Sequence, residues 1–206
     1  RKSYDTPLGL MPTDVPFVEE FSRRISLDGF EEEILHRSEH SIEFQMLWLR
    51  YVLDQPWQGQ VVPILCGSLH EFIEDGTSPL DHAPLRQALD TLRDMISAYP
   101  GRVVVIAGVD FSHVGMRFGS EEGVPPKVIQ RVKREDRAIL DALVRGEADT
   151  FFAAVQKNKD RNNLCGLSPI FMALYVVQPS PGTVLHYDIS VEDENESLVS
   201  FASLRF

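Results

Sequence analysis

The sequence predicts an α/β fold of three layers, in which helices cover a central, mixed β-sheet. Segments with helical periodicity alternate with short apolar segments, which is the pattern of a layered α/β protein. Apolar residues make up 43% of the chain and charged residues 25%, as in ordinary globular proteins. The 206 residues contain no repeat and no long Gly/Ser linker, so we expect a single large domain.

The first half of the chain is expected to hold three helices and a short strand. Asp14 is suited to cap a helix, with Pro16 in the first turn. A second helix is expected over residues 38–53, and a third over residues 83–99, before a Pro-Gly pair. Between them, the short apolar run over residues 61–66 favours a strand.

The strongest strand prediction is residues 102–109, a β-branched run bounded by glycines, as in a strand buried on both faces. Further helices are expected over residues 125–145, 148–156 and 168–177, and strands over residues 183–190 and 198–206. The last two strands are close enough in sequence to pair antiparallel, which is why the sheet is expected to be mixed.

Charge and cysteine content exclude several classes of function. The net charge is −11, which disfavours binding to nucleic acid and to anionic membranes. No apolar run approaches the ~20 residues that span a bilayer. Only two cysteines are present, Cys66 and Cys165, too few for a disulfide framework. We therefore expect a cytoplasmic protein, with Cys66 buried as a small apolar residue.

The first candidate site segment surrounds His40. Ser38 is suited to cap the helix over residues 38–53, which places His40 in its first turn. This helix carries apolar stripes on two sides, so it is expected to be buried with His40 pointing inward. The helix N-terminus would keep the imidazole neutral and able to coordinate, and Glu43 could bind the ring or the site. The alternative is a hydrogen-bonded core histidine without a function.

The second segment runs from Asp110 to Gly115 and directly follows the strongest strand. Asp110, Ser112 and His113 form a dense polar cluster where ligands of α/β sheets gather. Gly115 would let the backbone turn sharply away. The alternative is a plain turn with an Asp110 side-chain bond.

The third segment surrounds Cys165. Ser168 and Pro169 are typical of a helix start, so Cys165 lies just before a helix N-terminus. The helix dipole there favours the thiolate, which is both the nucleophilic and the metal-binding form of cysteine. The alternative is a buried, inert thiol.

Together these segments resemble the Memo family, called AmmeMemoRadiSam system protein B in bacteria and archaea. The matching motifs, in order, are Thr6-Pro7-Leu8-Gly9, Glu39-His40-Ser41-Ile42-Glu43, Asp110-Phe111-Ser112-His113, Cys165-Gly166 with Pro169-Ile170, and Val199-Ser200-Phe201-Ala202-Ser203. The resemblance implies a fold similar to class III extradiol dioxygenases. It also implies a metal pocket formed by His40, His113 and Cys165, with Asp110 beside it, that holds iron or copper.

The family has a further pocket histidine in an upstream Gly-Pro-Ser-His segment, which residues 1–206 do not contain. We therefore expect a single Memo-like domain over residues 1–206 without its N-terminal strand segment, unless this member lacks that ligand. Two imidazoles and a thiolate suit iron, copper or zinc rather than magnesium or calcium.

Three functions remain open on the sequence. The first is a metal-binding redox protein or non-haem oxidoreductase that uses His40, His113 and Cys165 as ligands. The second is an enzyme with Cys165 as nucleophile, His113 as base and Asp110 as the orienting group. The third is a module that binds a small molecule or a peptide without turnover. An oligomer is compatible with all three.

Overall fold

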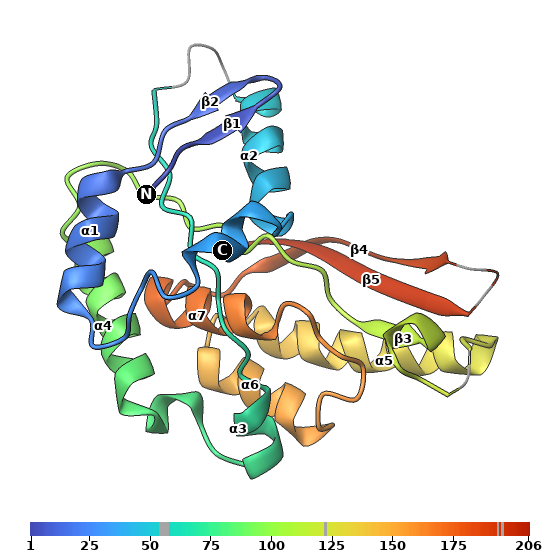
Figure 1. The fold of residues 1–206 in the computed structure, drawn as a ribbon. Helices are drawn as coiled ribbons and strands as arrows, with labels where there is room; N and C mark the ends of the chain where they lie inside the picture. Colours follow the sequence, from blue (N-terminus) through green and yellow to red (C-terminus); the bar gives the residue numbers. More distant parts are fainter. Residues whose placement is uncertain (54–57, 122, 193, 195) are drawn as a thin grey trace. The chain divides into compact units, whose positions relative to one another are not determined.

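The computed structural model describes residues 1–53, 58–121, 123–192, 194 and 196–206. The chain forms two compact units (Figure 1). Unit 1 comprises Arg1–Cys66 and Leu80–Val104, and unit 2 comprises Gly67–Pro79 and Val105–Phe206. Helices and strands are both present, which confirms the α/β class. Among the described residues, no helix is both long and apolar enough to cross a bilayer.

In its described residues, unit 1 is built on a small hairpin and three α-helices. Strand β1 pairs antiparallel with β2, and α2 packs against this hairpin. The Arg50 guanidinium of α2 donates to the Leu8 carbonyl in the hairpin turn at 2.8 Å. The elements are β1 (Tyr4–Thr6), β2 (Gly9–Met11), α1 (Val15–Arg24), the 3-10 helix η1 (Glu33–Arg37), α2 (Ser41–Val52) and α4 (Ala83–Ser97).

The predicted N-cap at Asp14 is confirmed. One carboxylate oxygen accepts a hydrogen bond from the Phe17 backbone N–H at 3.0 Å. The other accepts from the Tyr99 hydroxyl at 2.8 Å, which joins the end of α4 to the start of α1. These two helices lie side by side (Figure 1).

The described part of unit 2 combines a three-stranded antiparallel sheet with four α-helices. The strand order is β3-β5-β4. The long hairpin of β4 and β5 confirms the antiparallel pair expected at the end of the chain. The elements are α3 (His70–Asp75), β3 (His113–Gly115), the 3-10 helix η3 (Met116–Phe118), α5 (Pro126–Leu143), α6 (Ala148–Lys157), α7 (Leu167–Val177), β4 (Thr183–Glu192) and β5 (Ser197–Arg205). The short 3-10 turn η2 (Pro79–Asp81) lies where the two units meet in sequence.

Helix α5 packs its apolar stripe on the sheet of unit 2. Val132 of α5, Val114 of β3 and Leu198 of β5 form a buried cluster together with Val124. Burying side chains of this size stabilises the fold by roughly 1.5–3 kcal/mol each relative to leaving them exposed. This packing fixes the position of β3, and therefore the segment before it that carries the candidate site.

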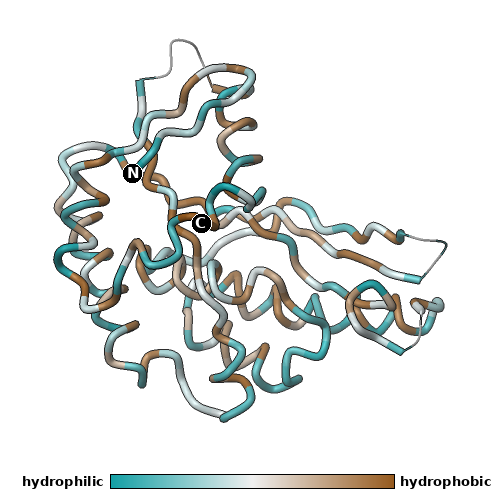
Figure 2. Tube along the Cα trace, in the orientation of Figure 1, coloured by the Kyte–Doolittle hydropathy of each residue, from teal (hydrophilic) through white to brown (hydrophobic). Residues whose placement is uncertain are grey.

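Two strand predictions are wrong. Residues 102–109 and 61–66 belong to no named strand, although both are strongly hydrophobic (Figure 2). Within the described ranges, an isolated bridge between Thr13 and Val61 is the pairing that touches them. Val104 is 74% exposed rather than buried. A β-branched run favours an extended backbone, but a strand also needs a hydrogen-bonded neighbour, which composition does not supply.

The mixed sheet and the three-layer arrangement are not confirmed. Both sheets of the described part are antiparallel throughout. The single domain over residues 1–206 stays a prediction.

The predicted helix over residues 38–53 is confirmed as α2, but its start and its burial were predicted incorrectly. The helix begins at Ser41, while Ser38 ends the preceding 3-10 helix and caps nothing in α2. One apolar stripe packs around Met46, which is 7% exposed. The second stripe (His40, Phe44, Leu47 and Tyr51) is largely open, since all of its members but the half-buried Leu47 are exposed. The two stripes therefore differ in burial although the periodicity treated them alike.

Candidate functional site

The segment of Asp110 to His113 is held on both sides by backbone hydrogen bonds within unit 2. On one side, the Phe111 N–H donates to the Ser200 carbonyl of β5 at 2.9 Å. On the other side, the His113 N–H donates to the Asn162 carbonyl at 2.7 Å. The segment therefore lies between β5 and the loop that leads to Cys165.

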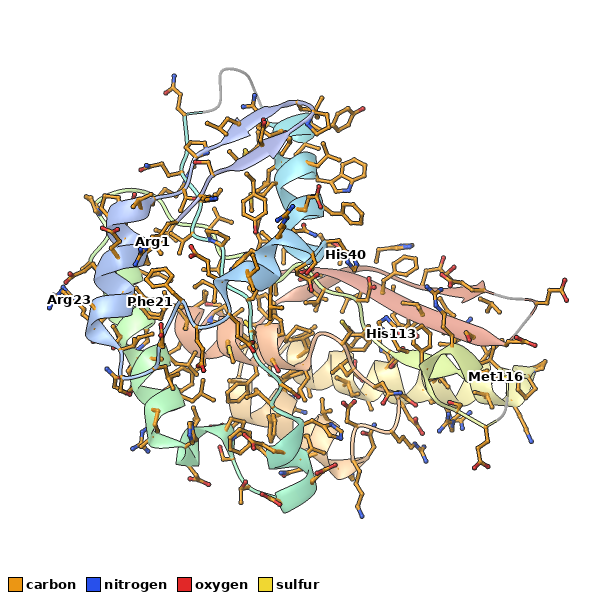
Figure 3. The ribbon with its side chains drawn as sticks, viewed as in Figure 1. Arg1, Phe21, Arg23, His40, His113 and Met116 are labelled. Carbon is orange, nitrogen blue, oxygen red and sulfur yellow. The ribbon has the colours of Figure 1, made fainter. Side chains whose placement is uncertain are left out.

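The His113 ring has a defined orientation (Figure 3). Its Nδ1 lies 3.3 Å from the Phe111 carbonyl oxygen, and its Nε2 lies 3.7 Å from a carboxylate oxygen of Asp110. The Phe118 ring packs edge-on against it at 4.8 Å between centroids. A hydrogen bond from Nδ1–H to the carbonyl would leave Nε2 as the basic nitrogen, on the side of Asp110.

Cys165 is joined to the same backbone carbonyl. Its N–H donates to the Phe111 oxygen at 3.0 Å. The thiol is exposed, and Gly166 is the N-cap of α7, so Cys165 directly precedes the helix as predicted. A Cβ at Gly166 would lie 2.9 Å from the Asp110 carbonyl oxygen and 2.7 Å from Val109. Glycine therefore permits the close approach of the two segments.

The predicted N-cap at Ser168 is wrong. The helix begins at Leu167, so Ser168 already lies in its first turn. Its hydroxyl instead accepts a hydrogen bond from the Leu69 N–H at 3.1 Å. A serine next to proline signals a helix start correctly, but the sequence does not specify which residue supplies the cap.

The loop before Cys165 is tightly constrained. The buried Asp160 carboxylate accepts from the Leu164 N–H at 2.8 Å, and burial raises the pKa of this carboxyl. The Asn163 side-chain amide donates to the His113 carbonyl at 3.2 Å. Asp160 and Asn163 both have positive φ, which Asp and Asn tolerate better than most residues. The loop therefore holds Cys165 against the His113 segment without regular secondary structure.

A buried carboxylate that the sequence reasoning missed lies behind the site. Asp136 of α5 has no solvent exposure and accepts from the Ser112 hydroxyl at 2.5 Å and from the Tyr187 hydroxyl at 2.7 Å. Burial raises its pKa, opposed by these hydrogen bonds and one from Ser200. Its position on the apolar stripe of α5, four residues after Val132, was the available signal.

His40 belongs to unit 1, whereas Asp110, Ser112, His113 and Cys165 belong to unit 2. His40 is the N-cap residue of α2 rather than a member of its first turn (Figure 3). Its side chain is 73% exposed rather than turned inward, and it packs edge-on against Phe44 with 5.5 Å between ring centroids. The carboxylate beside its ring is that of Glu39, at 3.7 Å, and Glu43 is exposed.

Over the part of the chain that the structure describes, no three His, Cys, Asp or Glu side chains already stand together as a metal site. What unit 2 does bring together is the pair of backbone segments that carry His113 with Asp110 and Cys165. The convergence of His40 with them, and the role of Glu43, stay predictions.

The two cysteines are expected to differ strongly in reactivity. Burial raises the pKa of the Cys66 thiol to about 11, so at pH 8 almost all of it is protonated and unreactive. Cys165 is exposed before a helix N-terminus, which favours thiolate. We expect iodoacetamide to modify Cys165 at least ~10-fold faster at pH 8, as measured by mass spectrometry of the two peptides.

Cys66→Ser provides the control for that comparison, because it should leave the Cys165 rate unchanged. As the pH rises toward 11, the difference between the two rates in the parent chain should narrow. Equal rates at pH 8 would contradict the assignment of Cys66 as the protected thiol.

Comparison with known proteins agrees with the motifs. The family model described as Memo-like protein matches residues 1–205. A MEMO1 family protein of Aquifex aeolicus is 26% identical over 98% of this chain and 49% of its own length. The MEMO1 family protein TTHA0924 of Thermus thermophilus is 24% identical over 98% of this chain and 55% of its own. The protein TK1477 of Thermococcus kodakarensis is 28% identical over 98% of this chain and 67% of its own.

The chain thus spans about half to two thirds of the length of these relatives. The family model, by contrast, covers almost every residue of the chain, including each of the site segments described above. The chain belongs to the Memo-like protein family.

Proposed function

We propose that this protein binds a transition-metal ion, iron or copper, in a pocket centred on His113 and Cys165, and uses it on a small molecule or peptide. The observation that carries the proposal is that both residues contact the same backbone carbonyl. The Phe111 carbonyl accepts the Cys165 N–H at 3.0 Å and lies 3.3 Å from His113 Nδ1. The two residues come from different segments that meet at this one carbonyl. Their imidazole and thiolate groups are donors that suit a soft or borderline metal.

The chemistry of the donor set supports this choice. Nδ1 of His113 faces a carbonyl oxygen, the common arrangement that leaves Nε2 basic for a metal or a proton. The Asp110 carboxylate on the Nε2 side can accept a proton or orient the ring. The exposed Cys165 thiol would ionise on binding. When bound, the ion would supply Lewis-acid or one-electron chemistry at a position open to substrate.

His40 remains the proposed third ligand on the strength of the motif Glu39-His40-Ser41-Ile42-Glu43. Zinc would fit the same donors without redox chemistry. Dioxygenase activity is not part of the proposal, because a cysteine departs from the two-histidine, one-carboxylate set of oxygen-activating non-haem iron.

Metal analysis of the 206-residue chain tests the proposal. The protein is purified without chelators, analysed by inductively coupled plasma mass spectrometry, then stripped and titrated anaerobically with Fe²⁺, Cu⁺ and Zn²⁺. We expect one ion per chain, with one metal among the three bound well below micromolar Kd. Binding weaker than about 1 mM for all three would overturn the proposal.

The contact of Asp110 with His113 at 3.7 Å favours a second candidate, a cysteine-dependent enzyme. In that enzyme Asp110 orients His113 at Nε2, so the base that activates Cys165 is Nδ1, which would have to leave the Phe111 carbonyl. Fast alkylation of Cys165 in chain stripped of metal, unchanged when metal is added, would favour it over the metal site. Protection of Cys165 by added metal would favour the first proposal.

A further inference from the structure

We infer that Asp136 is the positioning residue of this pocket, because its buried carboxylate fixes Ser112 and through it the backbone that carries Asp110 and His113. The inference concerns the proposed pocket and so rests on the proposed function. It goes beyond that proposal by assigning a role to a helix residue that lies outside all the motif segments.

The carboxylate of Asp136 is hydrogen-bonded to the site segment, to β4 and, through Ser200, to β5. One oxygen accepts from the Ser112 hydroxyl at 2.5 Å, and the other accepts from the Tyr187 hydroxyl at 2.7 Å. Asp136 and Ser112 have no solvent exposure, so water cannot replace a lost partner. The carboxylate thereby connects α5 to β4 and to the site segment.

Ser112 is held at three points. Its hydroxyl donates to Asp136, its N–H donates to the Ser200 hydroxyl at 2.9 Å, and its carbonyl accepts from the Ser200 N–H at 2.9 Å. The residues on either side carry the site, since Phe111 supplies the shared carbonyl and His113 the imidazole. A shift of Ser112 therefore displaces both the His113 ring and the Phe111 carbonyl that accepts the Cys165 N–H.

Asp136 is an unusual choice for packing alone. It lies on a stripe of α5 whose other members, Val132, Ile139 and Leu143, are buried and apolar. A leucine there would avoid the cost of dehydrating a carboxylate. What the carboxylate offers instead is a directional contact to Ser112, and a network of this kind specifies one arrangement of its members.

The test compares Asp136→Asn with Tyr187→Phe. Asparagine keeps the shape but offers one accepting oxygen, so it cannot accept from the Ser112, Tyr187 and Ser200 hydroxyls as the carboxylate does. Tyr187→Phe removes the hydroxyl that binds Asp136 and Ser200 but leaves Ser112 bound to Asp136, which makes it a matched structural control. Ser112→Ala removes the proposed contact directly, and it serves as the second variant if Asp136→Asn does not fold.

Two readouts are measured on the full chain. Titration with Co²⁺ gives Kd and the energy of the thiolate-to-cobalt charge-transfer band. We expect Asp136→Asn and Ser112→Ala to weaken binding about 10- to 100-fold and to shift the band, as loss of a ligand-orienting contact does. Tyr187→Phe should leave Kd within about 3-fold of the parent value and the charge-transfer band unshifted, even if this variant unfolds at lower temperature.

Hydrogen exchange of the His113 and Cys165 amides is the metal-free readout. Both amides should exchange at least ~10-fold faster in Asp136→Asn and Ser112→Ala than in Tyr187→Phe. If the parent binds no Co²⁺, the proposed metal function fails, and this exchange difference still decides the positioning role. Equal behaviour of Asp136→Asn and Tyr187→Phe in every measured readout would overturn the inference.

Discussion

Cys165→Ala is expected to reduce the affinity of the chain for its metal at least ~100-fold, because it removes the thiolate from the proposed ligand set. The side chain is exposed and precedes α7, so its loss leaves no cavity in the core. The Cys165 N–H that donates to the Phe111 carbonyl is a backbone group and remains in the variant. The measurement is a competitive titration against a chelator of known affinity.

Cys66→Ala is the matched control, because it removes the other thiol from a site that carries no candidate ligand. Its metal affinity should equal that of the parent chain within about 3-fold. Circular dichroism and a thermal melt check that both variants are folded. If Cys165→Ala keeps the parent affinity, Cys165 is not a ligand, and the cysteine-dependent reading becomes the better one.

Gly115→Ala should destabilise the chain by about 3–5 kcal/mol. Gly115 ends β3 with φ +124° and ψ −177°, a backbone conformation that side chains rarely adopt. An added Cβ would overlap the Glu196 carbonyl oxygen and lie 2.5 Å from the Ser197 Cα, and neither of these backbone atoms can rotate away. Because β3 begins at His113, the displacement would also reach the candidate site. Urea denaturation gives the free energy of unfolding.

Gly119→Ala separates backbone strain from the steric overlap. Gly119 also has positive φ, at +87°, but a Cβ there would meet nothing within 4 Å. The free energy of unfolding of this variant should fall by only about 1 kcal/mol, the cost of placing a residue with a Cβ in the left-handed conformation. Equal losses in the two variants would mean that the close approach to β5 contributes nothing.

Most helices were predicted well because their hydrogen bonds are local, but the short α3 (His70–Asp75) was not predicted. Asp14 and Pro16 set the start of α1, and the 3.6-residue periodicity of α5 located its buried face. The errors lie at helix ends, where Ser38 and Ser168 were given capping roles that His40 and Gly166 hold. A cap depends on the neighbouring backbone geometry, and residue type alone does not determine it.

The strands and the site were predicted less completely because their contacts are distant in sequence. Residues 102–109 have strand composition, but no ladder forms there in the described structure. Backbone hydrogen bonding to β5 begins only at Phe111, whose N–H donates to the Ser200 carbonyl. Asp136, the acceptor of the Ser112 hydroxyl, also lies outside the motif segments. Sequence patterns identify which residues are extended or polar, but not their partners.

The sequence by itself determined the α/β class, most of the helices and the family resemblance, and it predicted the segments around His40, His113 and Cys165 as candidate sites. Only the tertiary structure decided that the Phe111 carbonyl joins the His113 and Cys165 segments, and that the Asp136 carboxylate accepts a hydrogen bond from Ser112. The physical reason is the range of the interactions. Periodicity and capping act over a few residues, whereas the site depends on hydrogen bonds between residues 24 and 88 positions apart.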